Sequence, residues 1–216
     1  NIGTQTAAGN LVLTDQAGNP FHVIFSETPA GNQSADADAS RTAADSTFAI
    51  TVPPGATRTY AVAPVSALQP QMSGWARVEI AGGSLGGVAT FQYRPAGTLQ
   101  AVAGVMASAP IEFATIPVDN DNSQRRYAGF AVANQGTEDI AIHIELLDAG
   151  GTLYDSISPA SLSPLRAGHQ VAVFLHELMP ALVNFKGSMV LVPKEGSKVT
   201  VVALVLYEGL LTVVPV

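Results

Sequence analysis

Residues 140–151, Ile-Ala-Ile-His-Ile-Glu-Leu-Leu-Asp-Ala-Gly-Gly, indicate the fold most directly. Their apolar side chains recur at every second position up to Leu146, which is the period of a strand with one buried face. The Asp-Ala-Gly-Gly that follows is a turn sequence. Similar short runs recur about every eight to twelve residues, a spacing typical of β-sandwiches. The sequence therefore predicts an all-β protein, with helix limited to one or two turns around 176–182.

The chain also matches itself in two registers, which indicates an internal repeat. The matched pairs are Asn1/Asn134, Leu11/Ile144, Leu13/Leu146, Asp15/Asp148 and Gly18/Gly151 at an offset of 133, then Gly55/Gly168, Tyr60/Val173, Gly74/Gly187 and Val78/Leu191 at an offset of 113. The difference of 20 residues predicts an insertion in the first copy. We place this insertion at about 26–46, where small residues dominate.

The length of 216 residues suits two sandwiches of about a hundred residues each. We therefore expect two tandem β-sandwich domains. The first spans 1–105 and contains the insertion, and the second spans 111–216. The linker is Ala-Ser-Ala-Pro at 107–110.

The second copy has two strand-like segments, 113–118 and 126–133, before Asn134, and the given sequence has no counterpart before Asn1. The first domain is therefore expected to lack one or two N-terminal strands, which would expose backbone groups and part of a core. Three explanations remain open: the chain is a fragment, a neighbouring subunit donates a strand, or the segment 99–110 folds back. Strand donation is an established mode of recognition. The candidate intersubunit residues, taken from the terminal strands, are Asn1, Leu11, Leu13, Leu204, Leu206 and Val214.

Two motifs carry a resemblance to a known type of module. They are Gly-Trp-Ala-Arg-Val-Glu at 74–79 and Phe-Ala-Val-Ala-Asn at 130–134, set in the order Asn-x-Gly-Thr, strand, Asp-x-x-Gly turn, strand. This order resembles tandem immunoglobulin-like β-sandwich modules of large secreted or surface-exposed bacterial proteins, and the likeness covers nearly the whole chain. It implies an immunoglobulin-like fold, an extracellular or cell-surface location and no enzymatic activity. The second copy departs from it, because Gly-Ser-Met at 187–189 replaces Gly-Trp-Ala.

The composition excludes several classes of partner. Hydrophobic residues make up 47 % of the chain and charged residues 12 %, with a net charge of −7. A nucleic-acid-binding protein needs a basic surface that this chain lacks. The longest apolar run near the end, 199–205, is too short to span a bilayer, so we expect no membrane insertion. The absence of cysteine excludes disulfides and thiolate chemistry.

No catalytic group stands out, and the chain is expected not to be an enzyme. Gly-Gly-Ser-Leu-Gly at 82–86 matches the Gly-x-Ser-x-Gly pattern, but a nucleophile elbow needs a helix after it. Here two strand-like segments flank the motif, which favours a hairpin loop. The pair His176-Glu177 begins like a zincin helix, but no histidine follows at the required spacing.

Weak binding candidates remain. Asp36 and Asp38 in the insertion, and Asp119 and Asp121 between the domains, could supply oxygen ligands to calcium, although solvated turns are the simpler interpretation. No other cofactor is expected. Trp75 and Tyr93 could line a carbohydrate site, although core packing is the simpler role. The triplet beginning at Asn32 is a formal glycosylation sequon.

These features predict a structural subunit of an extracellular, pilus-like filament or surface assembly, held together through sheet edges as a homo-oligomer or polymer. The alternative is a passive adhesion or spacer module of a larger secreted bacterial protein. A carbohydrate-binding module is a third, weaker hypothesis. A filament subunit should polymerise, a spacer should stay monomeric and a carbohydrate module should be retained on polysaccharide.

Overall fold

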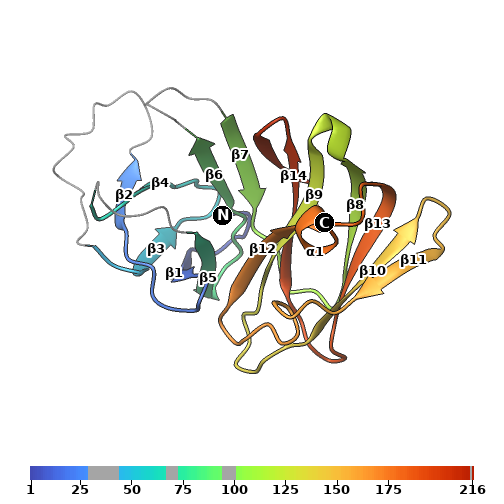
Figure 1. Cartoon of the computed structure of the whole chain (residues 1–216). Coiled ribbons are helices and arrows are strands. Elements are labelled where there is room, and N and C mark those ends of the chain that lie inside the picture. Colours follow the sequence, from blue (N-terminus) through green and yellow to red (C-terminus); the bar gives the residue numbers. More distant parts are fainter. Residues whose placement is uncertain (29–43, 67–72, 94–100, 215) are drawn as a thin grey trace. The chain divides into compact units, whose positions relative to one another are not determined.

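A computed structural model describes residues 1–28, 44–66, 73–93, 101–214 and 216. Contacts divide the chain into two compact units, Asn1–Gly86 and Gly87–Val216. Almost all regular structure in the described residues is antiparallel β (Figure 1), so the predicted all-β class is confirmed. The predicted helical segment is a single turn, α1 (Leu175–Leu178).

The strands of the first unit are β1 (Ala7–Asp15), β2 (Ile24–Thr28), β3 (Thr47–Val52), β4 (Thr59–Ala63) and β5 (Gly74–Gly82). Those of the second are β6 (Val88–Tyr93), β7 (Ala101–Met106), β8 (Ala114–Asp121), β9 (Arg126–Ala133), β10 (Ile142–Asp148), β11 (Leu153–Ile157), β12 (Gln170–Phe174), β13 (Asn184–Pro193), β14 (Thr200–Tyr207) and β15 (Leu210–Val214). A short 3-10 helix, η2 (Asn122–Gln124), connects β8 to β9.

The first unit contains a three-stranded sheet in the order β3-β1-β5 and a separate pair, β2-β4. Its core is small. Val23, Phe25 and Phe48 are buried, and the Phe25 ring stacks on Phe48 and Tyr60 with centroid separations of 4.3 and 4.7 Å. The alternating buried positions of β3 follow the strand period.

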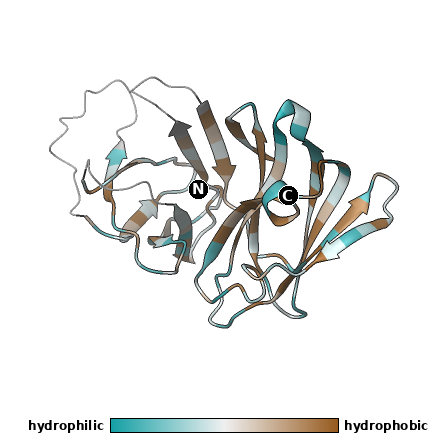
Figure 2. Cartoon of the chain, in the orientation of Figure 1, coloured by the Kyte–Doolittle hydropathy of each residue, from teal (hydrophilic) through white to brown (hydrophobic). Residues whose placement is uncertain are grey.

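The second unit has a larger core and a longer sheet path, β11-β10-β13-β8-β9-β14-β15, with β12 also paired to β9. Strands β8 and β9 pair only at Asp121 and Arg126, so the path consists of two four-stranded halves joined at one point. Buried side chains from both halves, among them Ile116, Phe130 and Met189, form one cluster, which makes the unit sandwich-like. Hydrophobic and hydrophilic bands alternate along several of these strands (Figure 2).

Residues matched by the sequence repeat have the same strand pairing in both units. Leu11 pairs with Val78 and Asp15 with Gly74, and the matched residues pair in the same way in the second unit. Asp15 Oδ1 accepts hydrogen bonds from the N–H groups of Ala17 and Asn19 at 2.9 and 2.8 Å. The corresponding bonds in the second unit run from Gly150 and Thr152 to Asp148 Oδ1, at 2.8 and 2.9 Å.

An asparagine holds the chain before the first strand of each matched set. The Nδ2 group of Asn134 donates to the carbonyls of Glu138 and Leu165 at 2.8 and 3.1 Å, and its Oδ1 accepts from Gly136 N. Asn1 makes the same three bonds, to Gln5, Val52 and Gly3, each at 2.8 Å. Each asparagine thus connects a segment matched at the offset of 133 with a segment matched at the offset of 113. Gln5 and Glu138 differ by 133, whereas Val52 and Leu165 differ by 113.

Several boundaries differ from the sequence expectations. The compact units meet between Gly86 and Gly87, and not at 105–111, because β6 pairs with β7 and both fall within the second unit. The start of the expected insertion, 26–28, is the end of β2, and most of the remainder lies outside the described residues.

Candidate functional site

The outer side of β5 is the feature of the first unit that most resembles a binding site. Strand β5 is the last strand of its sheet, and β1 pairs with it on one side only. Its counterpart β13 pairs with β10 on that side and with β8 on the other. Among the residues that the structure describes, no strand occupies the position on β5 that β8 occupies on β13. We call this side, along residues 76–78, the open edge of β5.

The face of β5 that corresponds to a core face is also exposed. Val78 and Ile80 are 45 % and 38 % exposed, whereas Leu191 and Pro193, the matched residues of β13, are buried. Ala76 is exposed where the matched Met189 is fully buried. An open backbone edge next to exposed apolar side chains is a site at which another strand can add.

The residues chosen from the sequence for intersubunit contact in the first unit do not lie at this edge. Leu11 is in β1, the central strand, and pairs with Phe48 on one side and Val78 on the other. Leu13 is in the same strand, and Asn1 makes the local hydrogen bonds described above. Sequence reasoning missed that the edge could be found through the repeat. Strand β8 pairs with β13, and the strand of the first copy that matches β13 is β5.

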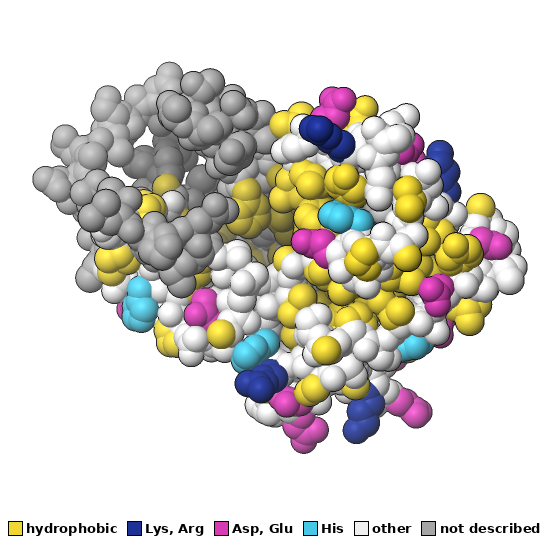
Figure 3. Space-filling view, in the orientation of Figure 1, with side chains coloured by type: hydrophobic (Ala, Val, Ile, Leu, Met, Phe, Trp, Pro, Cys, Tyr) yellow, Lys and Arg dark blue, Asp and Glu magenta, His cyan; other side chains and the backbone are white. Residues whose placement is uncertain are grey.

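In the second unit, Leu204 and Leu206 lie in β14, which is flanked by β9 and β15 and has no open side there. Val214 lies in β15, the outer strand of the path, and is half-buried against the core. Of these three residues, only Val214 is placed at a sheet edge. Figure 3 shows hydrophobic side chains gathered over the second unit on the face drawn, with most charged side chains toward the margins.

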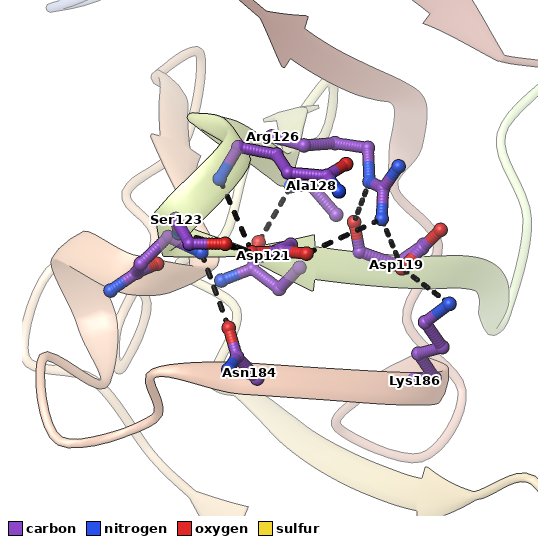
Figure 4. Close-up of polar contacts among 10 residues, drawn as sticks. Asp119, Asp121, Ser123, Arg126, Ala128, Asn184 and Lys186 are labelled. Carbon is purple, nitrogen blue, oxygen red and sulfur yellow. Dashed lines mark hydrogen bonds and ion pairs between the residues drawn. The ribbon is translucent and has the colours of Figure 1, made fainter.

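Asp119 and Asp121, the calcium candidates on β8, are already engaged by cationic and N–H groups (Figure 4). An Asp119 carboxylate oxygen lies 3.0 Å from the Arg126 guanidinium and 3.6 Å from Lys186 Nζ. Asp121 accepts from Ser123 Oγ at 2.6 Å and from two backbone N–H groups of η2. Asp119 is therefore engaged by two positive side chains and Asp121 by η2, and this geometry favours an ion-pair and hydrogen-bond network.

The environment of Asp121 lowers the pKa of its carboxyl below the ordinary range. The hydrogen bond from the Ser123 side chain is the main cause, and the two backbone N–H groups and Arg126 act in the same direction. The described residues contain no cluster of three or more His, Asp or Glu side chains placed to hold a metal ion. Asp36, Asp38 and Asn32 lie outside the described residues.

Ser84, the centre of the Gly-x-Ser-x-Gly motif, lies between β5 and β6, and strand β6 follows where an elbow requires a helix. The expected hairpin is wrong, however, because β5 pairs with β1 and β6 pairs with β7. His143 is half-buried with its Nδ1 3.0 Å from Ser158 Oγ, in agreement with the alternation of its strand.

Trp75 and Tyr93 do not form a described carbohydrate platform. The Arg77 guanidinium carbon lies 5.6 Å from the centroid of the Trp75 ring, and Arg77 also pairs with Glu79 at 2.6 Å. The arginine thus occupies space over the ring that a sugar would need. The side chain of Tyr93 lies outside what the structure describes.

Within the described ranges, no helix has the length and hydropathy needed to span a bilayer. Comparison with protein-family models found no match, and comparisons with curated proteins and with solved structures found none either.

Proposed function

We propose that the chain is a non-enzymatic structural subunit of an extracellular filament or surface assembly, built from immunoglobulin-like modules and joined through sheet edges. The observation that carries this proposal is the contrast between β5 and β13. Among the described residues, β13 pairs with a strand on each side, whereas its matched strand β5 pairs with a strand on one side only. A sheet edge next to exposed Val78 favours self-association when nothing covers it.

Two further observations support a structural role over a catalytic one. Ser84 lies in a connection between two strands, where an elbow geometry is not available. The acidic side chains of β8, Asp119 and Asp121, contact Arg126, Lys186 and the N–H groups of η2, as expected of an ion-pair and hydrogen-bond network at the surface.

The test is electron microscopy and light scattering of the purified 216-residue chain over a concentration series. We expect filaments or large oligomers that grow with concentration. Val78→Lys should reduce them strongly, since a charged side chain on an edge strand opposes the addition of another strand. Val183→Lys is the matched control: Val183 is 54 % exposed and lies between α1 and β13, outside any strand.

A wild-type chain that stays monomeric at every concentration would overturn the filament proposal and favour the adhesion or spacer alternative. Equal loss of assembly in Val78→Lys and Val183→Lys would mean that general surface charge, and not the open edge of β5, controls association.

A further inference from the structure

The second unit shows which kind of strand fits beside β13. Residues of β8 pair antiparallel with it, with Ala114 opposite Leu191 and Ile116 opposite Met189. Ala114, Ile116 and Val118 point into the core and are buried, while the residues between them point outward. Strand β8 therefore fits because small or β-branched apolar residues alternate along one face.

A second segment of this chain has the β8 pattern. Residues 113–118 read Phe-Ala-Thr-Ile-Pro-Val, and residues 211–216 read Leu-Thr-Val-Val-Pro-Val. The two segments share the Pro-Val pair and a bulky apolar first residue. Thr212 and Val214 take the places of the buried Ala114 and Ile116. Most of the second segment forms β15, whose Leu210 and Leu211 are 52 % and 41 % exposed.

We propose that β15 (Leu210–Val214) of one copy pairs antiparallel with the open edge of β5 in a second copy. Transferring the β8–β13 register through the repeat places Thr212 opposite Val78, Val213 opposite Arg77 and Val214 opposite Ala76. The pairing joins copies head to tail, because the two surfaces lie in different units of the chain. It rests on the proposed function and names the partner of that site.

The proposed contact uses the side of β15 that does not pair with β14. Strand β14 pairs with β15 along one side, and β15 is the outer strand of the path. Strand β7 lies against β15, but no pairing between them is found among the described residues. The added strand therefore has to take a place beside β15 without a hydrogen-bonded competitor, but next to the contact with β7. One short strand buries less area than a stable interface needs, so association should depend steeply on concentration.

Cysteine cross-linking tests the register, and the natural chain contains no cysteine to interfere. Full-length Val78→Cys and Thr212→Cys proteins are made separately, mixed and oxidised, and the mixed disulfide is measured by mass. The control mixture is Glu79→Cys with Thr212→Cys, a slip of one residue that turns the side chains to opposite faces. We expect about tenfold more mixed disulfide from the in-register pair, because only that pair points its two Cβ atoms to the same face of the sheet, as a disulfide requires.

Tryptophan fluorescence and circular dichroism of each variant check that it folds. If Val78→Cys fails this check, Arg77→Cys with Val213→Cys tests the same register on the other face. Equal yields from the in-register and slipped pairs overturn the proposal. Filaments without selective cross-linking leave the proposed function standing on another contact. Selective cross-linking without filaments keeps the pairing and removes the filament function.

Discussion

Strands β5 and β13 pair with matched strands, β1 and β10, on one side, but they differ in what lies on the other side. Both pair with the strand that ends in the Asp15 or Asp148 turn, in the same register. Beyond that pairing, Leu191 of β13 is fully buried, while Val78 of β5 is 45 % exposed. The comparison teaches that hydrogen bonds within the sheet define the register, whereas burial depends on what covers the sheet.

The largest effect expected from this comparison is on core packing. Leu191→Ala should lower the free energy of unfolding by about 2–5 kcal/mol, because it leaves a cavity in a closed core. Val78→Ala should lower it by at most about 1 kcal/mol, since the side chain is half-exposed. Urea unfolding followed by circular dichroism measures both. Trp75, the only tryptophan, reports on the first unit. A cost for Val78→Ala as large as that for Leu191→Ala would show that β5 is covered in solution.

The next effect concerns the two asparagines. Asn134 is fully buried, and Asn134→Ala removes three hydrogen bonds. The Leu165 carbonyl keeps its bond from Ile140 N–H, whereas the Glu138 carbonyl and the Gly136 N–H lose the bond to the asparagine. We expect a loss of about 2–3 kcal/mol. Asn1 makes the same bonds but is partly exposed, so water replaces them and Asn1→Ala should cost about 1 kcal/mol. Thermal unfolding of the two variants measures the difference, and equal losses would contradict an effect of burial.

Local features of this fold were predictable from the sequence, and the order of the strands was not. The alternation at 140–146, the Asp148 turn and both registers were read from neighbouring residues, and the pairing of β10 with β13 follows them. Nothing local shows that β1 lies between β3 and β5. That arrangement placed Leu11 in the middle of a sheet, although the sequence suggested a strand available for intersubunit pairing.

The candidate sites followed the same rule. Asp119 and Asp121 were recognised as closely spaced oxygen ligands, but Lys186 comes from a distant strand and its approach depends on the β8–β13 pairing. The open edge of β5 was missed for the same reason. It is defined by the position that β8 takes beside β13, which only the tertiary structure reveals.

The Asp15 and Asp148 turns should respond alike. Each aspartate accepts two backbone N–H bonds at an exposed turn, and Asp15 also accepts one from Asn19 Nδ2 at 3.1 Å. The backbone bonds are the shared part, so Asp15→Ala and Asp148→Ala should each cost about 0.5–1.5 kcal/mol. Trp75 fluorescence follows the first variant and circular dichroism the second. A large difference between the two losses would show that the two turns, despite their matched backbone bonds, contribute differently to the stability of their units.

The smallest expected effect is on the pH dependence of stability, which should differ between the two units at alkaline and acid pH. Burial raises the pKa of Tyr60, with the Glu27 carboxylate adding to the shift, so its stabilising contribution is present below about pH 10 and is lost as the pH rises through the folded value. The pKa of Asp121 is lowered, so its contribution is present above its ordinary value of 3.8 and is lost as the pH falls through the folded value.

Tyr60→Phe should therefore reduce the alkaline sensitivity of the Trp75 signal and leave acid unfolding unchanged. Asp121→Asn should reduce the acid dependence measured by circular dichroism and leave the Trp75 signal at high pH unchanged. Both proteins are titrated in parallel with the wild type at fixed salt, because Asp121 is exposed and its ion pair with Arg126 is screened. If either substitution changed stability at both acid and alkaline pH, the two units would have to unfold in one shared transition. The pH dependence of one unit could then not be assigned to that unit alone.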